Sequence, residues 1–413
     1  MQDDTPNPPG APPPDGDAHD VEARSPAPDL VHAADVSHLV SDAAARPAAD
    51  AGAWADAGAA AWRAAAEAAP GLPPEAIARS RRALVVWLGI LLAFGVGGLA
   101  FGQQELALLV VIAGVVTAAH AADFHRQFEL LYRVVSVTLI GFLGLALVAL
   151  GAAVWRSGAT GWPRTVVPIV SVASALIVFA TGLPPVARAL AGALFGARGD
   201  SHSYRLAARL TLFGFLLAFP GWFATQQLLD SPEATAEMFS RLTLGSAGIG
   251  YVILALAAVG FLVRRDVRAT LERLGLTRLT PSHLAWIAIG VPVLWAANAA
   301  GERGEHLWFP ALWAADQRVN TALAGALSRP AMVLVAASAG VGEEITMRGA
   351  LQPKLGIVLT ALFFAALHVQ YSWYGIAMIF AFGLLFGWIR RRTNTGVAIG
   401  VHFLYDLLAL IAT

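Results

Sequence analysis

Apolar runs long enough to cross a lipid bilayer recur along this chain from residue 83 to its C-terminal end, and they constrain its fold more than any other feature. A helix needs roughly 20 apolar residues to cross the hydrocarbon core, and only helices or closed barrels satisfy their backbone hydrogen bonds in lipid. Of 413 residues, 57% are hydrophobic and 14% are charged, unlike an ordinary soluble protein. The sequence therefore predicts an all-α, polytopic membrane helix bundle with about eleven spans. We expect these spans near 83–102, 104–122, 134–154, 165–184, 211–229, 242–263, 282–299, 330–347, 355–369, 374–389 and 396–412.

The first 78 residues differ from the remainder in composition and charge. They are rich in Pro, Ala, Asp and Gly and hold 13 acidic residues against three arginines, a net charge of −10. Such a segment has too few large apolar residues to build a core, so we expect a disordered acidic tail over 1–78. The chain then divides into a six-span membrane region over 79–263 and a second membrane region over 264–413.

The distribution of basic residues between the loops predicts the orientation in the membrane. If the N-terminus is cytoplasmic, the cytoplasmic loops carry 18 Arg and Lys residues and the opposite loops carry six. The positive-inside rule therefore predicts a cytoplasmic N-terminus and an outer C-terminus, in a bacterial cell membrane. This orientation places Lys354 inside.

The last four spans contain few ionisable residues, and each is unfavourable in lipid by about 2.5–3.5 kcal/mol on insertion scales. Proteins keep such groups where they pair, line a wet cavity or do chemistry. The candidate site residues are Glu343, Glu344, Arg348, His368, His402 and Asp406.

The spacing of these residues predicts how they face one another. Glu344 and Arg348 are four residues apart, so they share a helical face and can pair. Glu343 lies about 100° around the helix and is free to point at a neighbouring span. His402 and Asp406 also share a face, so the polar faces of three helices can converge on one cavity.

Structural roles are the alternative for each of these groups. The Glu344–Arg348 pair can be a structural bridge, and a histidine in a membrane helix can simply bond a backbone carbonyl or a neighbouring helix. Glu343 fits a structural role least well, because a second carboxylate gains little from an arginine that is already matched.

Three short motifs follow one another across the final spans: "EEITMR" at 343–348, "FAALH" at 364–368 and "HFLYD" at 402–406. They match the patterns EExxxR, FxxxH and Hxxx(N/D) in that order. The chain thus resembles the CPBP family, the CAAX-protease and bacteriocin-processing (Abi) membrane proteins related to the type II CAAX prenyl endopeptidase. The resemblance covers roughly the last 100 to 130 residues, so that 264–413 would be a CPBP-like catalytic region.

The resemblance implies an intramembrane endopeptidase with no cofactor. Glu343 and His368 would orient and deprotonate a water molecule, Arg348 would hold Glu344, and His402 with residue 406 would stabilise the oxyanion. An ionised Asp406 can only accept hydrogen bonds, so it would have to be protonated or act by orienting His402. Zinc is an alternative, since Glu and two His could supply three ligands, but the sequence has neither Cys nor an HExxH motif.

Two other functions are compatible with buried ionisable groups. A proton-coupled transporter would predict further ionisable residues in the first six spans, which have almost none. A non-catalytic membrane scaffold would not need Glu343, His368 and His402. For the protease we expect a peptide or protein substrate, a lipid bilayer around the chain and no nucleic acid. Because Glu343 would lie in the inner half of its span, we also expect the cavity to open toward the cytoplasm.

Overall fold

The computed structural model describes residues 74–413, so the acidic tail predicted for 1–78 falls almost wholly outside the described residues. Within 74–413 the chain is helical, and its one β-bridge is the isolated pair Phe261 and Arg265. The all-α membrane bundle is therefore confirmed. The helices of the first half are α3 (Pro74–Ala100), α4 (Gln104–Phe124), η2 (Arg126–Phe128), α5 (Glu129–Arg156), α6 (Trp162–Ala180), α7 (Pro184–Phe195), η3 (Gly196–Asp200), α8 (His202–Leu229), α9 (Pro232–Met238) and α10 (Arg241–Ala258).

The second half contains the motif-bearing helices. Its elements are α11 (Val267–Leu274), α12 (Pro281–Trp308), α13 (Pro310–Gly325), α14 (Arg329–Glu344), η4 (Ile345–Leu351), α15 (Gln352–Ala366), α16 (Trp373–Arg392) and α17 (Thr395–Ala412). The segment η4 is a π-helix. Such wide turns often occur at functional sites in membrane and soluble helices.

Nine helices in the described part are long and apolar enough to cross a membrane, against the eleven spans predicted. One predicted span corresponds to the apolar helix Leu242–Ala258, which is shorter than the others. Two more, near 330–347 and 355–369, fall within one continuous run of helical residues, Arg329–Ala366, which is interrupted at Gly356.

That stretch nevertheless reverses direction, and Gly356 is where it does so. Gly356 has φ 77° and ψ 175°, a conformation that a glycine adopts without a side-chain clash. In a straight helix, 16 residues would separate Arg348 from Phe364 by roughly 24 Å. The Arg348 guanidinium instead lies 5.1 Å from the centre of the Phe364 ring, so α15 runs back alongside η4.

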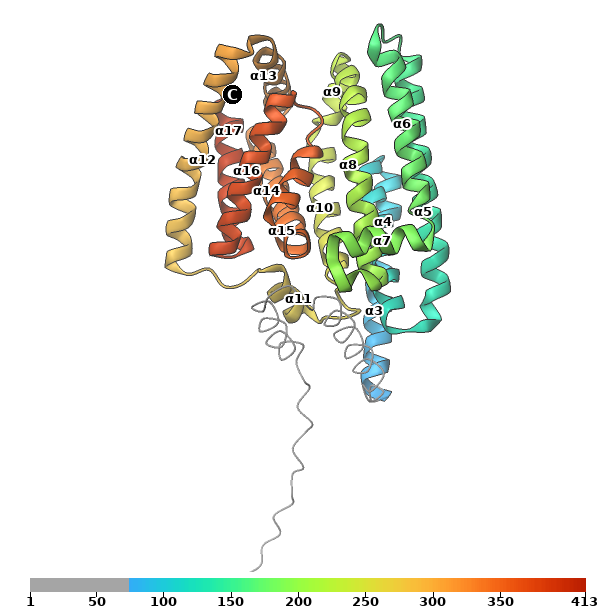
Figure 1. Cartoon of the computed structure of the whole chain (residues 1–413). Coiled ribbons are helices and arrows are strands. Elements are labelled where there is room, and N and C mark those ends of the chain that lie inside the picture. Colours follow the sequence, from blue (N-terminus) through green and yellow to red (C-terminus); the bar gives the residue numbers. More distant parts are fainter. Residues whose placement is uncertain (1–73) are drawn as a thin grey trace, which may run out of the picture. The chain divides into compact units, whose positions relative to one another are not determined.

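The two ends of the bundle carry different connections (Figure 1). One end, here called the closed end, carries α7, α11 and the turn at Lys354. The other, here called the open end, carries α9, α13 and the C-terminus. At the closed end, Lys354 Nζ donates to the carbonyl of Ala258 (3.1 Å) and Arg273 donates to the carbonyl of Gly349 (3.0 Å), which ties that end together.

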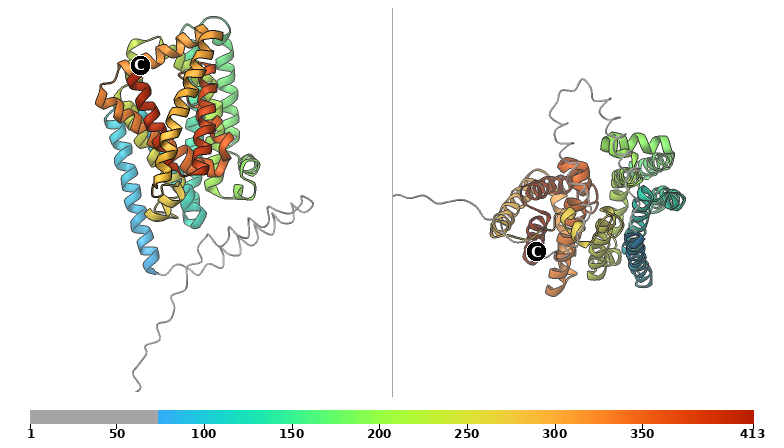
Figure 2. Two further views of the ribbon diagram at one scale, coloured as in Figure 1. Left: turned by 90° about the vertical axis from the view of Figure 1, so that its left-hand side faces the viewer. Right: turned by 90° about the horizontal axis from the view of Figure 1, so that it is seen from below.

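Helix α10 connects the two halves, since it packs against α4 on one side and against α14 on the other. Seen from below, the helices of the first half and those of the second form neighbouring groups (right view of Figure 2). The contact with α14 is very close: a Cβ at Gly342 would lie 2.9 Å from the Cα and from the carbonyl oxygen of Gly248. Two residues earlier in α14, a Cβ at Gly340 would lie 2.9 Å from the backbone nitrogen of Phe403 in α17. Glycines therefore let α14 approach both neighbours backbone to backbone, just before its two glutamates.

Candidate active site

The six predicted residues come from three helical segments of the second half. Glu343 and Glu344 end α14, and Arg348 lies in the π-helical turn η4 that follows. His368 comes two residues after α15, while His402 and Asp406 lie on α17. The structure brings the members of this set together as described below.

Glu344 and Arg348 form a fully buried ion pair. Arg348 Nε lies 3.1 Å from Glu344 Oε2, and both side chains are 0% exposed. The guanidinium lies between two aromatic rings, 5.1 Å from the centre of Phe364 and 5.8 Å from that of Phe386. Attraction of a cation to the ring faces adds to the pair in this dry setting. The pairing expected from four-residue spacing is therefore present.

His402 connects this buried pair to two further carboxylates. Its Nδ1 is 3.0 Å from Glu344 Oε1, and its Nε2 is 3.3 Å from Asp406 Oδ2 and 4.0 Å from Glu343 Oε2. The ring also stacks on Phe386, with centres 4.8 Å apart and planes at 23°. A carboxylate accepts hydrogen bonds, so carboxylates on both sides favour the form of His402 that carries protons on both nitrogens.

His368 is oriented by the backbone. Its Nδ1 is 2.8 Å from the carbonyl oxygen of Phe364, and its ring packs against the Phe364 ring at 4.6 Å. A carbonyl can only accept, so Nδ1 carries the proton of the neutral ring and Nε2 carries the lone pair. The backbone contact thus fixes which nitrogen can accept a proton.

A cavity of about 670 Å³ contains these groups. Glu343, His368 and His402 all line it, together with Asp406, whereas Arg348 lies behind the aromatic rings. The Glu343 side chain is 22% exposed and that of Asp406 is 26% exposed, in contrast to the buried Glu344. The structure therefore separates the adjacent glutamates, one facing the cavity and one facing the arginine.

The cavity extends toward the open end of the bundle. Its outer lining comes from α13 and the chain terminus, including Asp316, Asn320 and Thr413. The expectation that the cavity opens on the side of Lys354 is therefore wrong, and which side of the membrane is cytoplasmic stays a prediction. The physical reason is that Arg348 and the rings of Phe364 and Phe386, all buried, fill the site on the side toward Lys354.

Residues 325–408 match the family model described as type II CAAX prenyl endopeptidase Rce1-like. The uncharacterized protein YpbD of Bacillus subtilis (strain 168) is 30% identical over 158 residues, which are 38% of this chain and 80% of that protein. This chain belongs to the Rce1-like (CPBP) family.

Membership of the Rce1-like family makes this chain an integral, multi-pass membrane protein and a CAAX-type intramembrane protease that acts on a peptide or protein. The matched residues 325–408 begin at the end of α13 and run into α17, so they include all six candidate residues. No solved structure matches the chain.

The donor atoms of this Rce1-like protein decide whether the site can hold a metal ion. Within 74–413, no group of three or more His, Cys, Asp or Glu side chains is placed to hold a metal ion. His402 directs one nitrogen at Glu344 and the other at Asp406. The ligand set suggested for zinc, Glu343 with His368 and His402, is therefore not assembled in the described part of the chain.

Residues that sequence reasoning missed surround the segment after His368. Tyr371 lines the cavity and donates to Asn320 Oδ1 (3.0 Å). Ser372 donates its backbone N–H to Asp316 Oδ1 (2.7 Å), and its hydroxyl lies 2.9 Å from Asp316 Oδ2 and 3.2 Å from Glu305 Oε1. The sequence did offer one signal for these residues, because Glu305 and Asp316 are acidic residues on apolar helices. Their helices, α12 and α13, precede the family motifs, so the motifs did not point to them.

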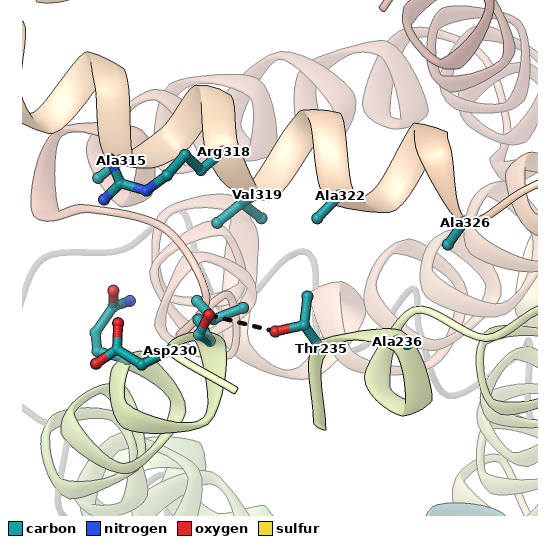
Figure 3. A pocket seen from close by; sticks show the side chains of 10 residues that line it. Asp230, Thr235, Ala236, Ala315, Arg318, Val319, Ala322 and Ala326 are labelled. Atoms are coloured by element: carbon teal, nitrogen blue, oxygen red, sulfur yellow. Dashed lines mark hydrogen bonds between the residues drawn. The ribbon is translucent and has the colours of Figure 1, made fainter. Parts of the chain in front are cut away.

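A second pocket lies outside this site, between α13 and the turn from α8 to α9 (Figure 3). Its volume is about 400 Å³, and Asp230 and Arg318 are among its lining residues. None of the six candidate residues lines it. The large cavity is thus the one that holds the proposed chemistry.

Proposed function

We propose that this chain is an intramembrane endopeptidase in which Glu343 and His368 activate a water molecule for attack on a peptide bond. The observation that carries the proposal is that Glu343, His368 and His402, from three separate helical segments, line one cavity. Glu343 is partly exposed there and is the carboxylate that Arg348 does not neutralise. A carboxylate without a cationic partner is free to accept a proton from a water molecule bound in the cavity.

In the proposed reaction, the water oxygen attacks the carbonyl carbon while Glu343 takes a proton from the water. His368, with its lone pair on Nε2, accepts a hydrogen bond from the same water and orients it. The C–N bond of the tetrahedral intermediate then breaks, and the proton held by Glu343 passes to the leaving amine. Water supplies every atom added, so no other reactant is needed.

His402 is the proposed stabiliser of the oxyanion. Its Nδ1 is held by Glu344, so that Nε2 is turned toward the cavity carboxylates and the reacting centre. Preorganised donors of this kind lower the barrier because they need not reorient as charge develops. Asp406, at 3.3 Å from Nε2, would keep the ring charged and in place rather than donate to the oxyanion itself.

The proposed mechanism uses no metal or other cofactor. Its support is the arrangement of donors: both nitrogens of His402 and one of His368 already face oxygen acceptors. We therefore expect a metal chelator to leave the rate of cleavage unchanged.

The proposed orientation has the N-terminus in the cytoplasm and the C-terminus outside, in a bacterial cell membrane. Its support is the excess of basic residues at the closed end, where Arg264, Arg265, Arg268, Arg273 and Arg278 surround α11. With this orientation, the cavity opens on the outer side. Peptides on that side, or segments in the outer half of the bilayer, would then be the substrates.

We further propose that 264–413 is the catalytic region and that the six helical spans of 79–263 support it. Their contacts at α10 and α8 are the support for this division.

Turnover of a fluorogenic peptide by the purified protein in detergent tests the function. Glu343→Gln keeps the shape of the side chain but cannot take up a proton, and we expect its turnover to fall by at least about a thousandfold. Glu233→Gln, an exposed change on α9, is the matched control. Undiminished cleavage by folded Glu343→Gln protein would remove Glu343 as the base.

A further inference from the structure

The lining of the active-site cavity is acidic. Five carboxylate side chains line it, and no lysine or arginine does so among the described residues: the five are Glu302, Glu305, Asp316, Glu343 and Asp406. His402, even when protonated, offsets only one of them. Arg348 does not compensate the cavity, because it is buried and paired with Glu344.

Glu302 has no role in the proposed catalysis, and among these carboxylates it is the one most available to bind a cation from the substrate. It lies on α12, outside the segment that matches the family, and is partly exposed. It accepts a hydrogen bond from Asn298 Nδ2 (2.9 Å) and forms no ion pair within the described part of the chain. A neutral amide leaves the charge of Glu302 uncompensated, so it can attract a cation that enters the cavity.

Glu305 and Asp316 extend the negative charge toward the open end. Both are buried, at 4% and 6% exposure, and both contact the hydroxyl of Ser372. A hydroxyl has one proton to donate, so it can satisfy only one of the two carboxylates as a donor. The second contact requires a proton on one carboxyl group, and the pair then keeps one negative charge.

The remaining wall of the cavity is aromatic and apolar. Tyr405 packs edge-on against Trp295, with ring centres 6.3 Å apart, and against Phe382 at 6.0 Å. Met378 and Ile379 line the cavity as well. This surface fits a large apolar side chain next to the charged lining.

We infer that the substrate is a peptide segment that places a lysine or arginine beside a large apolar residue in this cavity, and that Glu302 selects the cation. The inference rests on the proposed function for its site, and it adds the class of substrate.

Binding of labelled peptides to the Glu343→Gln protein tests the inference without requiring turnover. The peptides share one apolar sequence with a C-terminal amide and differ at a single central position, which carries Lys, Gln or Glu. We expect the Lys peptide to bind about tenfold more tightly than the Gln peptide, the order of one charge interaction in a partly wet cavity. The Glu peptide is expected to bind more weakly, and added salt is expected to reduce the differences.

Glu302→Gln in the same background identifies the selecting residue. The preference for Lys over Gln is expected to fall to about twofold or less, while affinity for the Gln peptide stays the same. Glu237→Gln, an exposed change on α9 at the same end of the bundle, is the matched control and should keep the full preference.

The outcomes separate this inference from the proposed function. Equal affinity for the Lys, Gln and Glu peptides, or a preference unchanged in Glu302→Gln, overturns the inference even if the wild type cleaves them all. A Lys preference that depends on Glu302 supports it, even if the wild type hydrolyses none of the peptides and the proposed function fails.

Discussion

Trp222 on α8 donates its indole N–H to the carbonyl oxygen of Tyr371, 2.7 Å away, and so connects the first half of the chain to the segment that follows His368. One turn further along α8, Gln226 Nε2 lies 3.3 Å from the carbonyl of Val369 and 3.2 Å from that of Gln370. On the other side, Asp316 and Asn320 hold Ser372 and Tyr371. The segment 369–372 is thus held from both sides, which positions His368 over the cavity.

The first prediction concerns this attachment. Gln226→Leu removes two hydrogen bonds to the segment after His368, and we expect kcat to fall about tenfold because the ring loses its exact placement. KM and the unfolding temperature in detergent should change little, since Gln226 does not reach the proposed catalytic groups. Gln227→Leu, the neighbouring change, is the control. A uniform loss of stability and activity in Gln226→Leu would indicate a structural role alone.

The second prediction concerns the buried partner of Arg348. Glu344→Gln leaves a guanidinium buried at 0% exposure without a charged partner and weakens the contact with His402 Nδ1. Removing one partner of a buried pair is destabilising by about 3–5 kcal/mol. We expect low yield and a lowered unfolding temperature together with lost activity, in contrast to Glu343→Gln, which should fold normally. Thermal unfolding of both variants in one detergent makes the comparison.

The sequence predicted features that depend on one helix at a time. The apolar runs gave the helical membrane bundle, and four-residue spacing gave the Glu344–Arg348 pair, because both follow from the geometry of a single helix. The direction of the cavity and the place of Tyr371 depend on how α12, α13 and α17 pack against one another. No local pattern encodes that packing, and the reversal at Gly356 is visible in sequence only as a glycine in an apolar run. The catalytic roles of the six residues stay predictions.

The third prediction concerns the close contact of α14 with α10. A methyl group at Gly342 would lie 2.9 Å from two backbone atoms of Gly248, which cannot move aside as a flexible side chain could. Gly342→Ala should therefore separate the two helices and reduce the free energy of unfolding by about 1–3 kcal/mol. It should also lower activity, because Glu343 and Glu344 directly follow. Gly114→Ala in α4, where nothing lies within 4 Å of the added methyl, is the control and should behave as wild type.

The fourth prediction concerns pH and Asp316, which lies on α13 outside the candidate spans. Burial raises the pKa of Asp316 above its ordinary value of 3.8, and hydrogen bonds from Ser372 oppose the shift. The folded state then holds the proton more tightly than the unfolded state, so this group's stabilisation is full at low pH. It is lost as pH rises from 3.8 through the raised value.

Asp316→Asn removes this dependence, since an amide does not titrate and can still accept from the Ser372 N–H. We expect the unfolding temperature of the wild type to fall relative to Asp316→Asn as pH rises from about 4 to about 7. Asp230→Asn, an exposed change at the same end, should follow the wild type. Parallel curves for the wild type and Asp316→Asn would show that no proton is retained there. Glu305 contacts the same Ser372 hydroxyl as Asp316 and titrates together with it, so the difference between the two curves reports this pair of carboxyl groups.

The last prediction concerns the side of the membrane on which the cavity opens. The chain contains no cysteine, so a single introduced thiol reports its own position. Arg268→Cys places the thiol on α11 at the closed end, where the native side chain is 88% exposed, and Glu237→Cys places it on the exposed face of α9 at the open end. Because basic residues favour the cytoplasmic side, we expect an impermeant maleimide to label Glu237→Cys in intact cells and Arg268→Cys only after permeabilisation. The reverse labelling pattern would show that the protein has the opposite orientation in the membrane. Substrates would then reach the cavity from the cytoplasm.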